Sequence, residues 1–186
     1  MAKSLDIDVD ALFFIQYVYE FTAFCTSSVV KMANGTIVHD RNLDFAFPDV
    51  MRKITFEGKF YQGDKYLFTG VMFAGYNGVL TGFKGGAFSI SINERKPSWR
   101  TDPFGLVMNF AFLFAGATQP SKLIRDTLTN CGDYSCAYNQ LTTVTVISPC
   151  YLIVAGTKDY EGAVITRDRT SIANLNQLSE SNWYVL

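Results

Sequence analysis

The sequence predicts a single α+β domain, and three observations predict it. The chain has 186 residues, of which 48% are apolar, enough for one domain with a buried core. Runs rich in β-branched and aromatic residues, the pattern of strands, lie towards both ends of the chain. Helical patterns lie between these regions, and strands that enclose helices are typical of the α+β class.

Residues 10–24 predict a helix near the N-terminus. Their apolar side chains recur with the helical period, and Asp10 supplies an N-cap. The segment is too short and too polar to span a bilayer. We therefore expect residues 1–24 to form a helical N-terminal segment and residues 25–186 to form the main domain.

An antiparallel sheet region is predicted between residues 26 and 95. Asn34-Gly35 separates two hydrophobic runs, at 28–32 and 36–39, which is a strong signal for a β-hairpin. The glycines of this region are interpreted as turns, because no Gly-Lys-Ser/Thr triplet follows them to form a phosphate loop. The further strands are predicted at 54–56, 66–69, 71–74, 79–81 and 88–92.

Helices dominate the next part of the chain. Residues 103–117 are apolar on nearly every side, and such a helix is either buried or against lipid. About fifteen residues are too few to cross a membrane, so this helix is expected in a core, in the wall of a lipid pocket or at a lipid surface. Shorter helices are predicted at 121–128 and 134–141, the second capped by Asp133. Strand signals return at 151–156, 163–166 and 183–186.

Composition excludes several classes of function. A formal net charge of −1 and an isoelectric point near 5.8 provide no basic patch for nucleic acid. The four cysteines, at positions 25, 131, 136 and 150, match no zinc pattern, and we expect no metal or cofactor. Cys131 and Cys136 are close enough for a local disulfide in an oxidising compartment, and reduced structural thiols are an equal alternative.

The first eight residues are polar and acidic and lack the features of a signal peptide. If the chain is complete as given, this predicts a cytoplasmic product. The triplet Asn34-Gly35-Thr36 is an N-glycosylation sequon, which would matter only in a secreted protein.

Cys25 is the candidate nucleophile. The hairpin brings it towards Arg41 and Asp44 on the next strand. A thiol must lose its proton before it attacks a carbonyl, and a nearby cation such as Arg41 favours the thiolate. Asp44 would orient the group that carries the proton. The alternative is that Cys25 is a buried structural thiol.

Two groups are candidates for the base. The chain has one histidine, His39, which would share a strand face with Arg41, so a Cys25–His39 dyad is one hypothesis. The other base is the α-amino group of Cys25, with an ordinary pKa of about 7.7–8, if the bond after Phe24 were cleaved. The second hypothesis requires no histidine.

Asn93-Glu94-Arg95 places three polar side chains at the end of an apolar strand. A buried Glu94 would need Arg95 or Arg41 as its partner, because an isolated buried charge is costly. A cluster in solvent at the strand end would need no partner.

The residues around Cys25 resemble those of the acid ceramidase and N-acylethanolamine-hydrolyzing acid amidase family, which are N-terminal nucleophile hydrolases. The similar motifs begin with Thr22-Ala23-Phe24-Cys25-Thr26-Ser27 and Arg41-Asn42-Leu43-Asp44-Phe45. Further similar segments lie at 73–83, 92–95, 162–169 and 183–185, so the resemblance covers nearly the whole chain.

This resemblance implies a fold and a nucleophile. The fold would be a four-layer αββα sandwich, incomplete at both ends. Cys25 would be exposed as the N-terminal nucleophile by autocatalytic cleavage of the bond that joins it to Phe24. Arg41 and Asp44 would position its thiol and amine, and Glu94 would form hydrogen bonds within the site.

The turn at Tyr76 and Asn77 is a candidate source of a backbone amide for the oxyanion hole, also by resemblance. The family's oxyanion asparagine follows the Trp-Tyr-Val motif, and this chain ends at Leu186, before it.

The implied activity is hydrolysis of the amide bond of N-acyl lipids, either N-acylethanolamines or ceramide, to a fatty acid and an amine. The resemblance also implies α and β subunits from one precursor, with residues 1–24 as the remnant of the α part. Contact with a membrane or micelle surface and a lysosomal location are further expectations. The alternative is a catalytically inactive, truncated relative that binds lipid or a partner.

Overall fold

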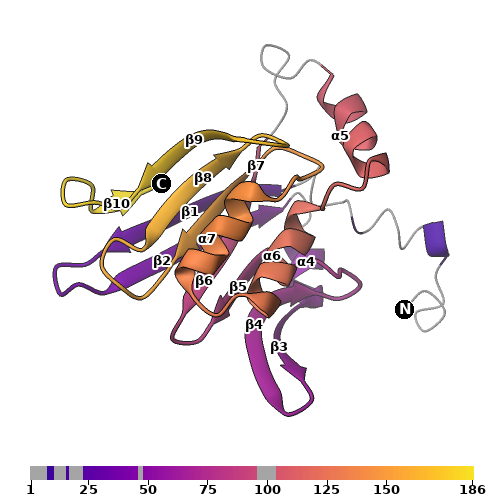
Figure 1. Cartoon of the computed structure of the whole chain (residues 1–186). Coiled ribbons are helices and arrows are strands. Elements are labelled where there is room, and N and C mark those ends of the chain that lie inside the picture. The colour runs from indigo at the N-terminus through magenta and orange to yellow at the C-terminus, as the bar shows by residue number, and fades with distance from the viewer. Residues whose placement is uncertain (1–7, 11–15, 17–22, 46–47, 96–103) are drawn as a thin grey trace.

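Two β-sheets form the centre of the protein (Figure 1). The computed structural model describes residues 8–10, 16, 23–45, 48–95 and 104–186. The strands are β1 Ala23–Lys31, β2 Ile37–Phe45, β3 Thr55–Gln62, β4 Lys65–Phe73, β5 Thr81–Lys84, β6 Phe88–Glu94, β7 Cys150–Ala155, β8 Gly162–Arg167, β9 Ile172–Gln177 and β10 Tyr184–Val185. The helices are α4 Pro48–Ile54, α5 Gly105–Phe114, α6 Pro120–Asn130 and α7 Tyr134–Thr143.

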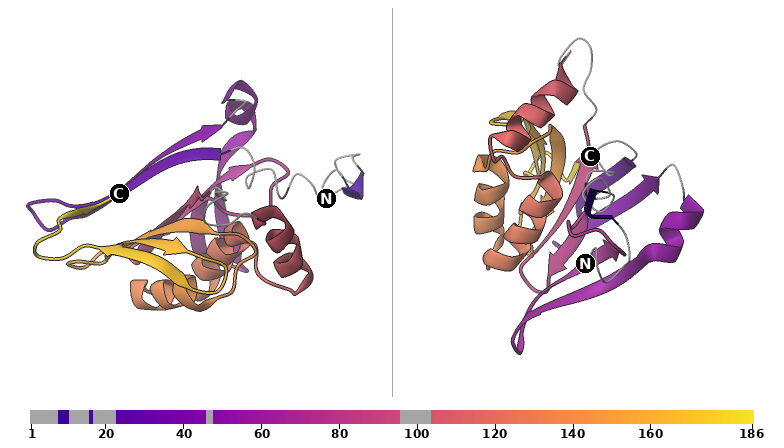
Figure 2. Two further views of the ribbon diagram at one scale, coloured as in Figure 1. Left: turned by 90° about the horizontal axis from the view of Figure 1, so that it is seen from above. Right: turned by 90° about the vertical axis from the view of Figure 1, so that its right-hand side faces the viewer.

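The sheets are stacked and antiparallel. The smaller sheet has the order β10-β1-β2, and the larger one has the order β3-β4-β5-β6-β7-β8-β9. The smaller sheet lies on one face of the larger one, and α6 and α7 lie on the other face (Figure 2). The described part therefore has a helical layer and two sheet layers. This confirms the α+β class and corresponds to three layers of the four expected in an αββα sandwich.

The main apolar core lies between the larger sheet and the helices α6 and α7. Pro120 occupies the first turn of α6. Proline lacks a backbone N–H, and at this position that N–H would have no partner within the helix. The predicted cap of α7 is confirmed, because Asp133 accepts a hydrogen bond from the backbone N–H of Cys136 at 2.8 Å. A disulfide joins Cys131, just after α6, to Cys136. The buried apolar side chains of the two helices include Leu123, Ile124, Leu128, Ala137 and Leu141.

The two sheets meet through two kinds of contact. One end of the interface is an apolar cluster whose buried members are Val29, Ile153, Ala155, Val164, Leu178 and Val185. The other end is polar, and Cys25 lies beside it. The polar side chains there form hydrogen bonds from one sheet to the other, and they are described with the site.

Several predicted boundaries were wrong. Ala23 and Phe24 belong to β1 rather than to the predicted helix, most of which lies outside the described residues. Ile54 ends the unpredicted helix α4 instead of starting a strand. The strand β9, in which three of six residues are polar, was also not predicted.

The two strands predicted at 66–69 and 71–74 are a single strand, β4. Gly70 lies within it, where the sequence suggested a turn. A Cβ at this position would lie 3.4 Å from the side chains of Met72 and Val79 and from the carbonyl of Thr81. These are ordinary van der Waals distances, so Gly70 continues the strand without a turn.

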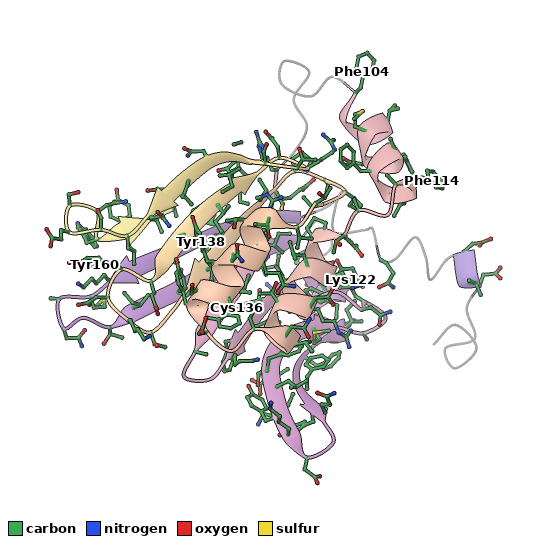
Figure 3. The ribbon with its side chains drawn as sticks, viewed as in Figure 1. Phe104, Phe114, Lys122, Cys136, Tyr138 and Tyr160 are labelled. Carbon is green, nitrogen blue, oxygen red and sulfur yellow. A yellow bond between two sulfur atoms is a disulfide. The ribbon has the colours of Figure 1, made fainter. Side chains whose placement is uncertain are left out.

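Helix α5 confirms the predicted helix, and among the predicted surroundings its exposure argues against the core. Phe104 is 70% exposed, Val107 is 66% exposed and Phe114 is 87% exposed. Phe104 and Phe114 point away from the rest of the protein (Figure 3). Arg169 attaches the helix to the segment after β8, since its guanidinium donates to the Asn109 side chain at 2.7 Å and to the Gly105 carbonyl at 2.9 Å. Across the described residues, no helix is both long and apolar enough to span a bilayer.

Candidate functional site

The β1–β2 hairpin brings Cys25 and Arg41 onto one face. The chain reverses at the predicted turn, where Gly35 has a φ of 85°, a conformation that glycine adopts readily. In the resulting register Ser27 pairs with Arg41, and Cys25 is two residues from Ser27. Alternate side chains of a strand point to the same face, so all three face the larger sheet.

Arg41 connects Cys25 to the larger sheet. Its Nη2 donates to Cys25 Sγ at 3.3 Å and to the Ile92 carbonyl at 2.6 Å. Its Nη1 donates to the Leu80 carbonyl at 3.1 Å and to Thr81 Oγ1. These three oxygen acceptors fix the guanidinium, which therefore holds a positive charge beside the thiol. Such a charge stabilises a thiolate, as a nucleophilic cysteine requires.

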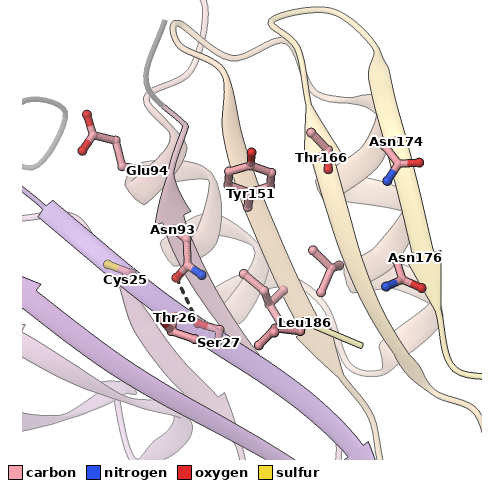
Figure 4. A pocket seen from close by; sticks show the side chains of 12 residues that line it. Cys25, Thr26, Ser27, Asn93, Glu94, Tyr151, Thr166, Asn174, Asn176 and Leu186 are labelled. Atoms are coloured by element: carbon pink, nitrogen blue, oxygen red, sulfur yellow. Dashed lines mark hydrogen bonds between the residues drawn. The ribbon is translucent and has the colours of Figure 1, made fainter. Parts of the chain in front are cut away.

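A pocket of about 380 Å³ opens beside Cys25 (Figure 4). Its walls come from β1 of the smaller sheet, from β6 to β9 of the larger sheet and from the end of the chain. This volume lies in the range of small-molecule sites. The residues that line it are Cys25, Thr26, Ser27, Asn93, Glu94, Tyr151, Ile153, Val164, Thr166, Asn174, Asn176 and Leu186.

Glu94 lines the same pocket as Cys25, although the two residues are far apart in the sequence. One of its carboxylate oxygens, Oε2, is buried. Arg95 forms an ion pair with Asp168 at 2.6 Å. The structure therefore places Glu94 in the pocket that Cys25 lines, and it places Arg41 beside Cys25.

Asp44 lies on the opposite face of β2 from Arg41. It is exposed, and its carboxylate accepts two hydrogen bonds of 3.1 Å from Asn42 Nδ2. Its backbone pairs with Phe24, the residue before Cys25. Asp44 is therefore adjacent to the proposed cleavage point, while its carboxylate and the thiol lie on different faces of the sheet.

Tyr76 and Asn77 lie outside the lining of this pocket. The Tyr76 hydroxyl donates to Ser121 Oγ at 2.7 Å within the main core. The backbone N–H of Asn77 donates to Gln16 Oε1 at 2.8 Å. Their contribution to an oxyanion hole remains a prediction.

His39 is not the partner of Cys25. It lies four residues along β2 from the position paired with Cys25, roughly 13 Å along the strand. Its Nδ1 is 2.8 Å from Ser89 Oγ and its Nε2 is 2.9 Å from Ser91 Oγ. The pKa of His39 is lowered to about 4, first by burial and then by the Arg41 charge, while the Asp40 charge opposes both. The Cys25–His39 dyad was therefore wrong.

Sequence reasoning missed a group of hydrogen-bonding side chains beside Cys25. Ser27 follows Cys25 at the next inward position of β1, and Ser91 and Asn93 occupy alternate positions of β6. Ser27 Oγ is 2.9 Å from the Asn93 amide and 3.1 Å from Ser91 Oγ. Period-two spacing of polar residues in strands next to a candidate nucleophile was the available signal. Within the described ranges, no cluster of three or more His, Cys, Asp or Glu residues is arranged to hold a metal ion.

The chain is similar to proteins of known name. No family model matches it. It is 37% identical to the N-acylethanolamine-hydrolyzing acid amidase of Cavia porcellus over 174 residues, which cover 92% of this chain and 48% of that protein. It is 32% identical to the acid ceramidase of Bos taurus over 202 aligned positions, which cover all of this chain and 50% of that protein. The chain spans about half the length of the curated relatives it matches.

One solved structure is similar over most of the chain. It is the Caenorhabditis elegans ortholog of N-acylethanolamine-hydrolyzing acid amidase, which matches with a TM-score of 0.76 at 36% identity. The match covers 86% of this chain and 67% of that one. The stacked sheets described above are therefore shared with that protein.

Proposed function

Because the chain belongs to the family of N-acylethanolamine-hydrolyzing acid amidases and acid ceramidases, we propose that it is an amidase that uses Cys25 as an N-terminal nucleophile. The substrate is an N-acyl lipid, either an N-acylethanolamine or ceramide. The products are a fatty acid and the corresponding amine. Cleavage of one precursor after Phe24 creates the active amino terminus and separates an α from a β part.

The hydrogen bond from Arg41 to Cys25 Sγ is the observation that carries this proposal. It supplies a fixed cation to a thiol that also lines a pocket of substrate size. The base must then come from another group, since His39 is engaged with serines of β6. The α-amino group that cleavage would create on Cys25 is adjacent to the thiol by covalent structure, and it serves as base in this proposal.

The proposed reaction has two stages. The amine takes the thiol proton as sulfur attacks the amide carbonyl carbon, and it then passes that proton to the departing nitrogen. The carbon–nitrogen bond breaks, the amine product leaves and an acyl-thioester remains. Water then attacks the thioester carbon, the α-amino group removes the water proton and returns it to sulfur, and the fatty acid is released. Glu94, in the same pocket, binds the polar part of the substrate.

We also propose that α5 contacts the lipid surface from which the substrate comes. Its apolar side chains are exposed, and an apolar helix that lies on a bilayer buries such side chains among the lipids. A lysosomal location follows from the same family. The Cys131–Cys136 disulfide supports it, because proteins reach that compartment through an oxidising pathway.

Intact mass spectrometry tests the cleavage directly. The purified wild-type chain should lose residues 1–24 at acidic pH, and Cys25→Ala should stay whole. Cys150→Ala is the matched control, because Cys150 is buried in β7 and does not line the pocket, so its removal should leave cleavage unchanged. Fatty-acid release from an N-acylethanolamine and from ceramide then separates the two substrates. A wild-type chain that stays whole and releases no fatty acid would contradict the proposal and favour the inactive relative.

A further inference from the structure

The turn that joins β1 to β2 carries a modification motif that the proposed hydrolysis does not use. Asn34-Gly35-Thr36 matches the N-glycosylation triplet, and no second triplet of this kind occurs in the 186 residues of the sequence. The turn closes through two backbone hydrogen bonds of 2.9 Å, from the Gly35 N–H to the Met32 carbonyl and from the Met32 N–H to the Thr36 carbonyl. Asn34 and Thr36 are both exposed, so the motif lies on the surface of the folded protein.

The side chain of Asn34 is held by its oxygen. Oδ1 accepts a hydrogen bond of 3.0 Å from the Thr36 backbone N–H, which makes an Asx-turn. A backbone N–H can only donate, so this neighbour distinguishes the amide oxygen from the nitrogen. No described residue accepts a hydrogen bond from Nδ2, the atom to which an N-linked sugar is attached. The turn therefore fixes the oxygen and leaves the nitrogen available.

The hairpin is anchored next to its turn. Lys31, the last residue of β1, forms an ion pair of 3.0 Å with Asp159, and its Nζ lies 4.0 Å from the centre of the Tyr160 ring. Both partners belong to the loop between β7 and β8. Apart from the chain neighbours, Asp159 is the nearest described residue to a Cβ built on Gly35, at 3.8 Å. A sugar on Asn34 would therefore extend from a fixed base into open surroundings.

The position of the turn keeps a sugar away from the pocket. The tip of the β1–β2 hairpin lies at the left edge of the molecule in Figure 1. Lys31 is six residues along β1 from Cys25, about 20 Å at the rise of a strand. None of residues 31–37 lines the pocket. A sugar at this turn is therefore compatible with an open pocket.

Two exposed apolar side chains flank the turn. Met32 is 48% exposed and Val38 is 42% exposed. A glycan is bulky and solubilising, so a glycan on Asn34 would add polar surface next to both side chains. It would thus reduce the apolar surface that the hairpin offers to other chains.

We propose that Asn34 is an N-glycosylation site. Its Nδ2 forms a bond to C1 of an N-acetylglucosamine that a lipid pyrophosphate carrier delivers. The bond from C1 to the pyrophosphate oxygen breaks, the lipid pyrophosphate leaves and Nδ2 gives up one proton to the transferase. This transfer takes place in the secretory pathway, so the proposal rests on the lysosomal location proposed above and not on hydrolysis. The Cys131–Cys136 disulfide belongs to the same oxidising pathway.

Secretion of the chain from animal cells behind an added signal sequence tests the site. We expect the secreted protein to carry one N-linked glycan. Peptide N-glycosidase F should then lower its mass in a single step and convert Asn34 to aspartate, which peptide mass spectrometry locates. Secreted protein whose mass the enzyme leaves unchanged would overturn the proposal.

Variants of the triplet separate recognition from folding. Asn34→Gln removes the acceptor and Thr36→Ala removes the hydroxyl that the triplet requires, so both should lose the mass shift. Thr36→Ser keeps a hydroxyl and should retain the shift, which assigns the loss in Thr36→Ala to that group and not to misfolding. Asn139→Gln, at an exposed asparagine of α7 outside any triplet, is the matched control and should also retain it. A shift that persists in Asn34→Gln would contradict the assignment.

The outcome can be separated from that of the proposed hydrolysis. A glycosylated chain that is not cleaved after Phe24 would keep the glycosylation site and reject the amidase. A chain that is cleaved there but carries no glycan would reject the glycosylation site alone. Because the turn is far from Cys25, enzymatic removal of the sugar should leave cleavage and fatty-acid release unchanged.

Discussion

Arg41 Nη2 lies 3.3 Å from Cys25 Sγ although the two residues are on different strands and are not paired across them. Arg41 pairs with Ser27, and Cys25 is its diagonal neighbour on the same face. Only a long side chain can reach a diagonal neighbour and still meet acceptors on the opposite sheet. The contact thus depends on an arginine at this register position.

Replacement of Arg41 by lysine should separate charge from geometry. Lysine keeps the charge but cannot reach Cys25, Ile92 and Leu80 at once, so we expect cleavage after Phe24 to slow at least about a hundredfold, the scale reported for loss of one oriented donor. The free energy of unfolding should fall by about 1–3 kcal/mol, because the carbonyls of Leu80 and Ile92 lose hydrogen bonds from a charged donor. Intact mass and urea unfolding measure the two effects.

The control for this change is Arg52→Lys in α4, where the side chain is 80% exposed. It should alter neither cleavage nor stability. Equal cleavage rates in Arg41→Lys and the wild type would remove Arg41 from the proposed mechanism.

Asp44 provides a second test of the cleavage step. Its backbone faces Phe24, so we expect its carboxylate to act on the amine side of Cys25 and not on the thiol. Asp44→Asn should slow cleavage at least about tenfold, as expected for loss of a group that assists proton transfer. Asp40→Asn is the matched control, since Asp40 is exposed on the same face of β2 and pairs with Ser28. Similar slowing by both variants would indicate a general charge effect.

Stability should fall with acid in a way that depends on His39. Its pKa is about 4 in the folded protein and about 6.5 when unfolded, so the unfolded chain binds more protons between these values. Stability is therefore lost as the pH falls from about 6.5 to about 4, by on the order of 3 kcal/mol. His39→Gln should flatten this part of the profile. Urea unfolding at several pH values in this window measures it, and parallel profiles for the two proteins would contradict the assignment.

Binding to lipid should depend on α5. The double variant Val107→Asn, Phe114→Ser removes two exposed apolar side chains and should weaken binding to phosphatidylcholine vesicles at least about tenfold, because each buried apolar side chain contributes about 1.5–3 kcal/mol. Tyr61→Ser, which removes an exposed aromatic ring from β3, is the control and should bind normally. Co-sedimentation gives the comparison. Equal binding by all three proteins would show that α5 does not contact lipid.

Much of the site could be predicted from short-range signals. Asn34-Gly35 specifies a hairpin, and a two-residue period then places Cys25 and Arg41 on one face. The same period places Asp44 on the other face, which the resemblance alone did not reveal. The hydrogen bonds that Ser27 forms with Ser91 and Asn93 could not be predicted, because they depend on which strand of the larger sheet lies opposite β1, and that is long-range information.

The errors in the fold have similar causes. Gly70 looks like a turn in the sequence, but it continues β4 and pairs with Gly58 and Gly82 on the neighbouring strands. The apolar residues 103–117 predict a helix that is buried or against lipid, and which surface covers it cannot be read from the helix itself. The strand β9 was missed because its side chains are mostly exposed, so its sequence shows little of the alternation between apolar and polar residues that marks a half-buried strand.

The contact between the sheets differs at its two ends, and this has a mechanical consequence. The hydrophobic effect is non-directional, whereas hydrogen bonds weaken steeply when their lengths or angles change. The end with Val29 and Val185 can therefore accommodate small shifts, while the end with Ser27 and Asn93 keeps its alignment. The strand that carries Cys25 is thus aligned by hydrogen bonds next to its sulfur atom, where attack on a carbonyl carbon requires accurate positioning.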